Sequence, residues 1–442
     1  MCGIFAIYSK KTFHINFLID ILDKLIHRGK DSFGISFIQK NNHNIDSLKS
    51  INKINYYDKN VYNNLSIAIT HNRYSTVKNK STHSMIYQAQ PILYNNDSIT
   101  FHLVHNGNIN NLETYIDYDE NLSDTQNIIH FFKKANQQNF ENTLIDFMNT
   151  IPSSFSIIIL FNNSLYVLRD SNGFKPLALG YINNDLCVIS EDCIGDFNKI
   201  RDIYPGEILK INGDGYKTLY QKETKNITKC IFEYIYFMNE KSTYNNISVY
   251  NIRKKLGANL ASIETRKFNK NNTIVVGSPN TAIPMGLGYA EYLNLEYNQV
   301  LKKEADCGRT FILKDQKERQ KFCKKFIFDK NKISGKNIIL VDDSLVRGNT
   351  IQNLSKLFYE NECKELHIRI CSPEIKYPCY YGIDIPTKEE LIINNFTLQE
   401  IEKKFNLTSI KYITKQKMID AFNDNNFCCS CFTGHSSKNL DW

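Results

Sequence analysis

Residues 336–350 read Lys336-Asn337-Ile338-Ile339-Leu340-Val341-Asp342-Asp343-Ser344-Leu345-Val346-Arg347-Gly348-Asn349-Thr350. Four apolar residues end in two carboxylates, and a loop of small and polar residues then leads into a helical pattern over 351–359. In open α/β sheets, ligands bind beyond the carboxyl ends of the strands. A loop that opens a helix presents unpaired N–H groups to a phosphate, and the helix dipole reinforces them. The stretch therefore predicts an α/β domain with a sugar-phosphate site; the alternative is a buried strand that ends at a solvated acidic pair.

The motif resembles the signature of the type I phosphoribosyltransferases. The resemblance implies that the two aspartates hold ribose hydroxyls and that residues 344–350 surround a 5-phosphate. The residues implied to contact 5-phosphoribosyl diphosphate are Asp342, Asp343, Ser344, Arg347, Gly348, Asn349, Thr350, Lys303 and Lys325. Mg²⁺ is expected to accompany the pyrophosphate of the substrate, with Asp342 and Asp343 as its candidate protein ligands.

The chain begins Met1-Cys2-Gly3-Ile4-Phe5. If Met1 is removed, Cys2 carries a free α-amine beside its thiol. A free thiol has a pKa of about 8.5 and an α-amine one of about 7.7–8.0, so the amine can accept the thiol proton near neutral pH. Taken alone, Cys2 is better interpreted as an unremarkable second residue; the rest of the chain favours the nucleophile.

Polar residues repeatedly follow strand-like segments in the first half. The segment 66–70 runs into His71-Asn72-Arg73, and 101–104 runs into His105-Asn106-Gly107, so both polar groups are expected in loops. A helix is predicted over 17–25 from its apolar spacing, and another after Ser123-Asp124-Thr125. Short strands are predicted at 155–161, 165–169, 176–180, 186–190 and 207–211, which suggests stacked sheets.

Several motifs in this half resemble those of the class II glutamine amidotransferases, which are N-terminal-nucleophile glutaminases. They are Cys2-Gly3-Ile4, His27-Arg28-Gly29-x-Asp31-Ser32, His71-x-Arg73-Tyr74-Ser75-Thr76, His105-Asn106-Gly107-Asn108-Ile109, Asp170-x-x-Gly173-x-Lys175-Pro176-Leu177, Ser190-Glu191 and Pro205-Gly206-Glu207. Each is weak alone, but an ordered set over residues 2–228 is a strong signal.

The resemblance assigns roles to these residues. Cys2 attacks the side-chain amide of glutamine, and the Asn106 side chain and the Gly107 N–H form the oxyanion hole. Arg73 binds the α-carboxylate and Asp124 the α-ammonium group. Arg28 and Gly29 lie in a loop that shapes the glutamine pocket.

Structural alternatives exist for three of these residues. Arg73 is compatible with an ordinary surface arginine, and Asp124 with a helix N-terminus capped by Ser123. Asn106-Gly107 is also a favourable hairpin turn. The functional interpretation is preferred because all three alternatives would have to hold together.

Twelve cysteines in a chain with no evident signal peptide argue against a disulfide framework. Cys428 and Cys431 form one CxxC pair, which is compatible with zinc, an iron–sulfur cluster or no metal. The family resemblance implies a 4Fe–4S cluster held by Cys230, Cys379, Cys428 and Cys431. Its expected role is structural, since it would fasten the C-terminal tail to the second domain.

The two halves together resemble the glutamine phosphoribosylpyrophosphate amidotransferase family. The resemblance implies the first committed step of purine biosynthesis, in which ammonia from glutamine forms 5-phosphoribosylamine. It also implies a pentosyltransferase, a homotetramer, purine nucleotide inhibitors, and closure of a loop spanning about 303–325 over the substrate.

Some segments depart from the family pattern. They are Asn280–Ala282, Glu304–Asp306, Cys323 and Lys175. Since the first three flank the pyrophosphate in the family, the runner-up is a catalytically weakened subunit that binds a phosphosugar or nucleotide. An amidotransferase with another acceptor leaves the paired aspartates unexplained.

The 442 residues predict two domains: an α+β N-terminal-nucleophile domain with stacked antiparallel sheets (αββα) over 2–228, and an α/β phosphoribosyltransferase domain with a mostly parallel sheet over 229–442. The net charge of +8 comes without a dense basic block, so nucleic acid is not expected as a partner. No apolar run predicts a membrane span, and a cytoplasmic location is expected.

Overall fold

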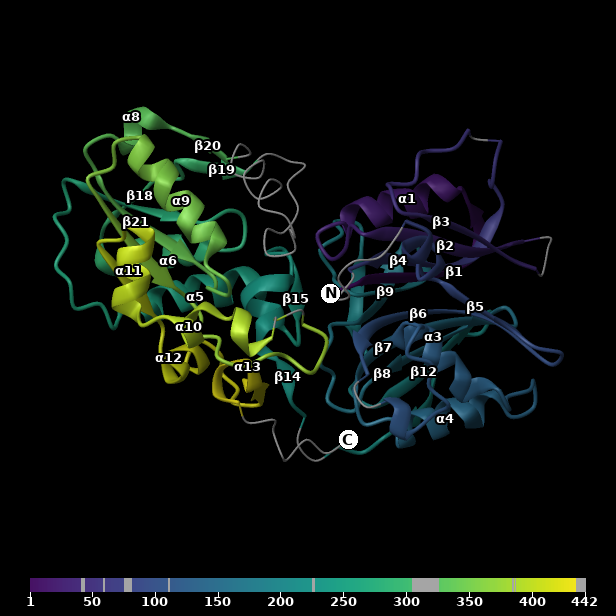
Figure 1. Ribbon diagram of the computed structural model, residues 1–442. Coiled ribbons are helices and arrows are strands. Elements are labelled where there is room, and N and C mark those ends of the chain that lie inside the picture. The colour runs from purple at the N-terminus through teal and green to yellow at the C-terminus, as the bar shows by residue number, and fades with distance from the viewer. Residues whose placement is uncertain are drawn as a thin grey trace.

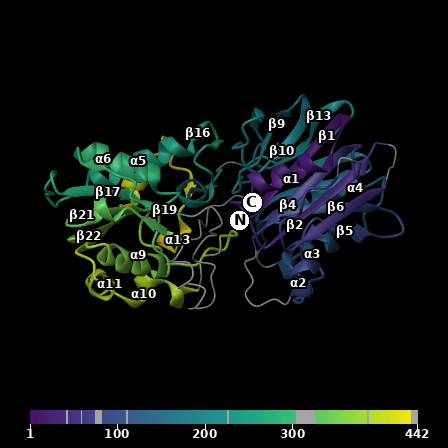
Figure 2. The same cartoon turned by 90° about the horizontal axis from the view of Figure 1, so that it is seen from above.

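The computed structural model describes residues 1–40, 44–58, 60–74, 82–109, 112–224, 227–303, 326–383, 385 and 387–434. Figures 1 and 2 show two lobes, one built from the purple-to-blue first half of the chain and the other from the teal-to-yellow second half. The N-terminus lies between them in both views, so Cys2 is close to the boundary of the lobes.

The first lobe contains two antiparallel sheets. The seven-stranded sheet has the order β11-β9-β10-β1-β4-β2-β3 and the six-stranded sheet the order β13-β12-β8-β7-β6-β5. Their strands are β1 (Gly3–Phe13), β2 (Ser32–Gln39), β3 (Ile45–Ser50), β4 (Leu65–Arg73), β5 (Ile92–Asn95), β6 (Thr100–Asn108), β7 (Ser154–Phe161), β8 (Ser164–Arg169), β9 (Ala178–Ile182), β10 (Asp185–Ile189), β11 (Asn198–Asp202), β12 (Glu207–Asn212) and β13 (Gly215–Gln221).

Three apolar layers hold this lobe together. Ile4 and Ile69 of one sheet pack against Val104 and Ile158 of the other in the central layer. On the outer face of the seven-stranded sheet lies α1, and on that of the six-stranded sheet lie α3 and α4. The helical segments of this lobe are α1 (Ile15–Lys24), α2 (Thr82–Tyr87), η1 (Leu112–Thr114), α3 (Asp124–Ile128), η2 (Ile129–Phe132) and α4 (Phe140–Thr150). The predicted αββα architecture is confirmed.

The second lobe is built on a five-stranded parallel sheet with the order β18-β17-β21-β22-β23. Its strands are β17 (Thr273–Gly277), β18 (Glu296–Tyr297), β21 (Asn337–Asp342), β22 (Glu365–Ile370) and β23 (Ser409–Tyr412). One face packs against α5 (Val249–Ala261) and α6 (Ile283–Leu293), and the other against α9 (Asn349–Glu360) and α11 (Leu398–Phe405). The predicted α/β class and the parallel sheet are confirmed.

Short elements complete the second lobe. They are β14 (Lys229–Cys230), η3 (Glu233–Phe237), β15 (Thr243–Tyr244), β16 (Ile247–Ser248), β19 (Leu301–Lys303), β20 (Phe326–Phe328), α8 (Lys330–Ile333), η5 (Lys388–Glu390), α10 (Ile392–Asn395), α12 (Lys415–Ile419), β24 (Phe427–Cys428) and α13 (Ser430–Thr433). Pairing of β14 with β24 brings the start of the lobe to its C-terminal end, with Cys230 opposite Cys428.

The prediction of loops at His71–Arg73 and His105–Gly107 is wrong, because these residues continue β4 and β6. His71 and Asn72 pair with β1 and β2 on either side, and Asn106 and Gly107 pair with Ser156 and Phe155 of β7. Asn106-Gly107 is therefore not a hairpin turn. The polar side chains stay in strands because hydrogen bonds to the neighbouring strands satisfy their backbone groups.

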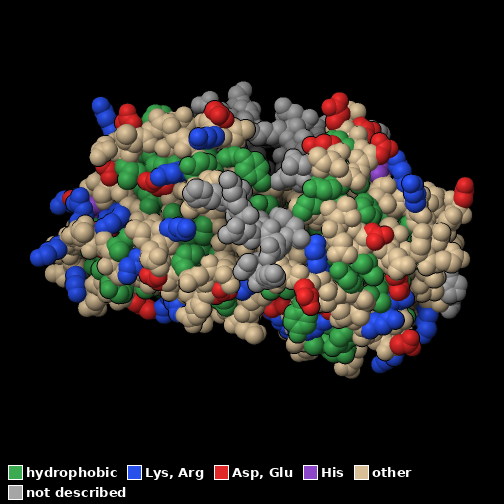
Figure 3. Space-filling model, turned by 90° about the horizontal axis from the view of Figure 1, so that it is seen from below, with side chains coloured by type: hydrophobic (Ala, Val, Ile, Leu, Met, Phe, Trp, Pro, Cys, Tyr) green, Lys and Arg blue, Asp and Glu red, His purple; other side chains and the backbone are tan. Residues whose placement is uncertain are grey.

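Basic and acidic side chains alternate over the face seen in Figure 3, without a continuous stripe of one sign. Within the described part of the chain, no helix has both the length and the hydropathy needed to cross a membrane.

Candidate functional site

Cys2 lies directly before β1, where the ends of β4 and β6 meet. Its backbone nitrogen donates to Asn106 Oδ1 at 3.1 Å, and the Tyr74 N–H donates to its Sγ at 3.5 Å. The thiol is partly exposed, whereas Asn106 is buried. The structure thus brings the predicted nucleophile to the predicted oxyanion-hole residue from 104 positions away in the sequence.

Asn106 is oriented by the bond to Cys2. Because Oδ1 accepts from Cys2, the Nδ2 amide group is left buried with no hydrogen-bond partner among the described residues. Buried donors nearly always find a partner, so an orphan beside a nucleophile indicates a place for a ligand acceptor. Gly107 follows in β6, where a Cβ would lie 2.2 Å from Ser154 O.

Arg73 ends β4 and is buried at 7% exposure. Its Nη2 donates to Gln88 Oε1 at 3.0 Å, while Nη1 is buried and unpartnered within the described part of the chain. Gly29 packs on the backbone of this residue, since a Cβ at Gly29 would lie 2.5 Å from the Arg73 carbonyl carbon. Arg73 is therefore not a surface arginine.

Asp124 is the first residue of α3, and Ser123 forms a capping box with Gln126. Its Oδ1 accepts from the Thr125 N–H at 2.7 Å, and its Oδ2 lies 3.7 Å from His105 Nδ1. The side chain is 31% exposed. The capping alternative is correct for Ser123, and the Asp124 carboxylate is partly exposed.

Arg28 lies behind Cys2. Its Nε donates to the Cys2 carbonyl oxygen at 2.8 Å, and its guanidinium pairs with Glu191 and with Glu233 of the second lobe. Lys175 lies 3.9 Å from the same Glu233 carboxylate, and all four side chains are fully buried. Burial alone would lower the pKa of Arg28, but the Glu233 and Glu191 carboxylates outweigh it and raise that pKa. The contacts described for Arg28 therefore hold the main chain of the nucleophile and join the two lobes.

Two buried histidines stand near this site. Burial lowers the pKa of His71 to about 3, and its Nε2 lies 3.2 Å from the carbonyl oxygen of His105. Burial also lowers the pKa of His105, against the opposing charge of Asp124. Both imidazoles are therefore neutral near pH 7.

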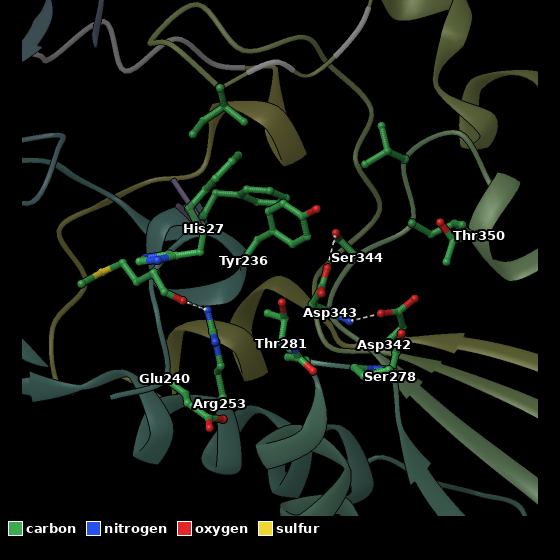
Figure 4. A pocket seen from close by; sticks show the side chains of 18 of the residues that line it. His27, Tyr236, Glu240, Arg253, Ser278, Thr281, Asp342, Asp343, Ser344 and Thr350 are labelled. Atoms are coloured by element: carbon green, nitrogen blue, oxygen red, sulfur yellow. Dashed lines mark hydrogen bonds between the residues drawn. The ribbon is translucent and has the colours of Figure 1, made fainter. Parts of the chain in front are cut away.

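A cavity of about 480 Å³ opens at the carboxyl end of β21. It is lined by residues 342–351, by Ser278 after β17, and by His27 and Lys30 from the first lobe. Figure 4 shows His27 and Tyr236 on one side of the cavity and Asp342 and Thr350 on the other. Groups from both lobes thus face one space.

The two aspartates interact strongly. The Asp343 N–H donates to Asp342 Oδ1 at 3.0 Å, and Ser344 Oγ donates to Asp343 Oδ1 at 2.6 Å. Burial and the neighbouring Asp343 charge raise the pKa of Asp342 well above its usual range. Two buried carboxylates so close together repel each other unless a cation or hydrogen-bond donors lie between them. A divalent metal would provide the cation, and sugar hydroxyls would provide the donors.

The loop after Asp343 ends at the N-terminus of α9. Gly348 caps this helix with a left-handed φ of 83°, and the first turn contains no acidic residue. The first N–H groups of a helix lack intrahelical partners, so this end suits an anion. Arg347 Nε pairs with Glu390 Oε2 at 2.8 Å, and residues 344–350 all line the cavity.

Two predicted phosphate contacts cannot be placed, because the side chain of Lys303 and all of Lys325 lie outside the described residues. The proposed closing segment from residue 304 onward, with Glu304–Asp306 and Cys323, lies there too. Asn280 and Thr281 do line the cavity.

The four predicted metal-binding cysteines come together from three segments. The thiols of Cys379, Cys428 and Cys230 act together to raise the pKa of Cys431, after burial as the main cause. The four thiols form one group of soft ligands that could hold a metal centre.

Backbone N–H groups near Cys379 also fit such a centre. The Tyr381 N–H donates to Cys379 Sγ at 3.3 Å, and Tyr381 and Ile383 N–H groups oppose the rise that burial causes in the pKa of Cys379. Hydrogen bonds to ligand sulfurs are a common feature of iron–sulfur sites.

A second group with metal-ligand chemistry consists of His27, Glu191 and Cys193, whose ligand atoms lie within 4.8 Å of one another. Arg28 and His27 both bind Glu191 Oε1, and Asn239 and Ser242 donate to Oε2. Because donors already surround this carboxylate, it is a weaker cation site than the cysteines.

Sequence reasoning gave no role to several residues that the structure brings into these sites. His27 and Lys30 reach the cavity of the other lobe, and Glu191 and Glu233 form the buried network with Arg28. Their motifs were visible, but chain order does not reveal which lobe a loop contacts.

Known protein families match both halves of the chain. A glutamine amidotransferase domain family matches residues 71–193, and a phosphoribosyl transferase domain family matches residues 244–373. The amidophosphoribosyltransferase of Methanocaldococcus jannaschii is 32% identical over 473 residues, covering 98% of this chain and 97% of the relative. That of Bacillus subtilis is 31% identical over 387 residues, covering 83% of this chain and 79% of the relative.

A solved structure is similar along its full length. It is the glutamine phosphoribosylpyrophosphate amidotransferase from Bacillus subtilis complexed with ADP and GMP, with a TM-score of 0.82 and 28% identity. The match covers 98% of this chain and 97% of that chain, so both lobes are included.

Proposed function

This chain belongs to the amidophosphoribosyltransferase family, and from that premise we propose that Cys2 and the Asp342–Asp343 loop form its two reaction centres. The family reaction transfers the amide nitrogen of glutamine to 5-phosphoribosyl diphosphate, the first committed step of purine biosynthesis. The products are 5-phosphoribosylamine, glutamate and diphosphate.

The first centre is proposed to work through the N-terminal residue. Removal of Met1 turns the Cys2 nitrogen into an α-amine, which takes the thiol proton. Sγ then attacks the amide carbon of glutamine, a thioester forms, and the C–N bond breaks as the protonated nitrogen leaves as ammonia. Water hydrolyses the thioester to glutamate and regenerates the thiol.

The position of the Asn106 side chain next to Cys2 is the main support for this proposal. Asn106 Oδ1 accepts from the Cys2 nitrogen, and its buried Nδ2 has no hydrogen-bond partner among the described residues. With the Gly107 N–H it would stabilise the oxyanion, and one such donor is commonly worth about 3 kcal/mol. Nη1 of Arg73, which has no partner within the described residues, and the partly exposed carboxylate of Asp124 would bind the two α-groups of glutamine, beside Arg28 and Gly29.

The second centre is proposed to bind 5-phosphoribosyl diphosphate in the 480 Å³ cavity. Asp342 and Asp343 would bind the ribose hydroxyls or Mg²⁺, and Ser344, Arg347, Gly348, Asn349 and Thr350 would surround the 5-phosphate. Lys303 and Lys325 remain proposed contacts to the pyrophosphate. Ammonia from Cys2 would then displace diphosphate at C1.

Release of glutamate from glutamine alone tests the first centre. We expect Cys2→Ala to lose this hydrolysis by at least about 10³-fold, since the nucleophile is gone. A Cys193→Ala variant, which keeps Cys2, should hydrolyse glutamine within about twofold of the unaltered protein. Hydrolysis retained in Cys2→Ala would exclude Cys2 as the nucleophile.

The cysteine set is proposed to hold a 4Fe–4S cluster through Cys230, Cys379, Cys428 and Cys431. The cluster would fasten β24 and α13 to β14, a structural role. Protein isolated without oxygen should be brown and contain about four iron and four sulfide per chain. Colourless protein loaded with zinc would contradict the cluster.

Regulation is proposed from a solved relative, and assembly from the family resemblance. The solved relative is complexed with ADP and GMP, which supports purine nucleotides as inhibitors here. A homotetramer and a cytoplasmic location are also proposed; ten described cysteines are free, which suits a reducing compartment.

A further inference from the structure

Residues 379–383 of the second lobe touch three separate features. Cys379 belongs to the cysteine set, the Tyr380 carbonyl accepts from Asn108 Nδ2 at 3.4 Å, and Ile383 lines the phosphoribosyl cavity. Tyr381 stacks on Phe174 of the first lobe, with ring centroids 4.8 Å apart and planes inclined by 20°. We call residues 379–383 the bridging segment.

Gly382 is the point at which the bridging segment meets the oxyanion strand. A Cβ at Gly382 would lie 3.1 Å from the carbonyl carbon of Gly107 and 3.2 Å from the nitrogen and Cβ of Asn108. The φ of Gly382 is 89°, a conformation that L side chains rarely adopt. A side chain at position 382 would therefore press on the peptide that joins Gly107 to Asn108.

Gly107 has little room to yield to a larger neighbour. It pairs with Phe155 of β7, and a Cβ on Gly107 would already lie 2.2 Å from Ser154 O and 2.6 Å from His105 Nε2. Pressure from residue 382 would therefore shift β6 itself. Asn106 and Gly107 would move away from the positions that face Cys2.

The bridging segment is itself anchored at its start. The Tyr381 N–H donates to Cys379 Sγ at 3.3 Å, and the Tyr381–Phe174 stacking holds the next turn of chain against the first lobe. Only two residues separate Cys379 from Gly382 along the chain, so the hydrogen bond to Cys379 and the stacking of Tyr381 on Phe174 fix the position of Gly382.

We propose that Gly382 is a positioning residue for glutamine hydrolysis: the bridging segment sets the place of the Gly107 oxyanion donor from the other lobe. This rests on the proposed function of Cys2 and Gly107. An oxyanion donor must lie within about 2.7–3.1 Å of the developing charge, and a 1 Å misplacement can cost about 10²-fold. The proposal concerns the first centre alone: of the bridging segment, only Ile383 lines the cavity of the second centre.

The test compares Gly382→Ala with Gly335→Ala. Gly335 also has a positive φ, 71°, but a Cβ there meets no atom within 4 Å, so it reproduces the backbone strain without the contact. We expect Gly382→Ala to lower kcat for glutamine hydrolysis at least about 10-fold, with KM for glutamine changed less than about threefold. Ammonia-dependent synthesis of phosphoribosylamine should stay within about twofold, as it should in Gly335→Ala.

A second variant tests the proposal in case Gly382→Ala does not fold. Asn108→Ala removes the hydrogen bond to Tyr380 without adding atoms, and should lower the same kcat by about threefold. The proposal is overturned if Gly382→Ala hydrolyses glutamine like Gly335→Ala, or if its hydrolysis and ammonia-dependent synthesis fall together. Failure of the Cys2 assignment would instead appear as hydrolysis that survives Cys2→Ala.

Discussion

The two terminal nitrogens of Arg73 differ in their partners. Nη2 donates to Gln88, whereas Nη1 is buried without a partner among the described residues. A carboxylate supplies two acceptors to such a fork, and hydrogen bonds to a charged group contribute about 1.5–3 kcal/mol. The Nη1 group of Arg73 is therefore placed to bind an anionic ligand such as a carboxylate.

Replacing Arg73 by lysine should weaken glutamine binding, because an ammonium group cannot make two parallel bonds. We expect KM for glutamine to rise about 10- to 100-fold while ammonia-dependent synthesis stays unchanged. Steady-state kinetics with both nitrogen donors measure this. An unchanged KM would remove Arg73 from the glutamine site.

Glu264 and Arg369 form a buried pair in the second lobe. Arg369 Nε and the Tyr289 hydroxyl both donate to Glu264 Oε2 at 2.6 Å, and the Glu264 side chain is 3% exposed. Burial opposes ionisation, but the Arg369 charge and these bonds lower the pKa of Glu264 to about 2. The pair lies away from both proposed centres and thus concerns stability.

The stability from Glu264 should depend on pH in a defined direction. Since the folded-state pKa lies below the unfolded value of about 4.3, the contribution is complete above about pH 4.3 and declines as pH falls towards 2. It amounts to about 3 kcal/mol. Urea unfolding should find Glu264→Gln less stable at pH 7, with a smaller difference at pH 3.

An exposed glutamate provides the control for that series. Glu291 pairs with Lys254 at 2.8 Å, but its side chain is 60% exposed, so Glu291→Gln should alter stability little at either pH. A difference for Glu264→Gln that grows as pH falls would contradict the assigned pairing.

The residues of the site were partly predictable. Cys2, Arg73 and Asn106 stand in motifs with a direct chemical interpretation. Arg28 stands in such a motif too, but its described contacts are with Cys2, Glu191 and Glu233. A partner 205 positions away is fixed by how the lobes meet, and local patterns do not contain that information.

At the scale of elements, strand–loop–helix order was predictable and element ends were not. The helices predicted over 17–25 and 351–359 are confirmed as α1 and α9. The strand predicted over 176–180 lies two residues later, at β9, and the helix after Ser123 is one short turn. In β4 and β6, polar residues extend the strands because tertiary pairing outweighs their preference for loops.

The turn from β21 into α9 makes a prediction at this scale. Gly348 has a φ of 83°, and a Cβ there would lie 2.6 Å from Ile392 Cδ1 and Phe405 Cζ. Gly348→Ala should therefore displace the loop and raise KM for 5-phosphoribosyl diphosphate about 10-fold or more, with glutamine hydrolysis kept.

Gly335→Ala is again the matched control, because its positive φ is strained in open space. Ammonia-dependent kinetics of both variants give the comparison. Equal KM values in the two would mean that the Gly348 turn does not shape the phosphate site.

At the scale of the whole molecule, the boundary between the lobes contains a buried ionic network and part of the cavity lining. The Arg28–Glu191–Glu233–Lys175 network is fully buried across it, and breaking one partner of such a network typically costs about 3–5 kcal/mol. His27 and Lys30 of the first lobe line the cavity of the second. The family resemblance predicted two joined activities, but composition and periodicity do not predict which surfaces meet.

The central claim is that ammonia made at Cys2 is used at the Asp342–Asp343 loop. Phosphoribosylamine formation by Cys2→Ala, with glutamine or with added ammonia, tests it most directly. We predict that synthesis from glutamine is lost while synthesis from ammonia continues within about twofold of the unaltered enzyme. Loss of both in a folded Cys2→Ala protein, or synthesis from glutamine that persists, would contradict the account.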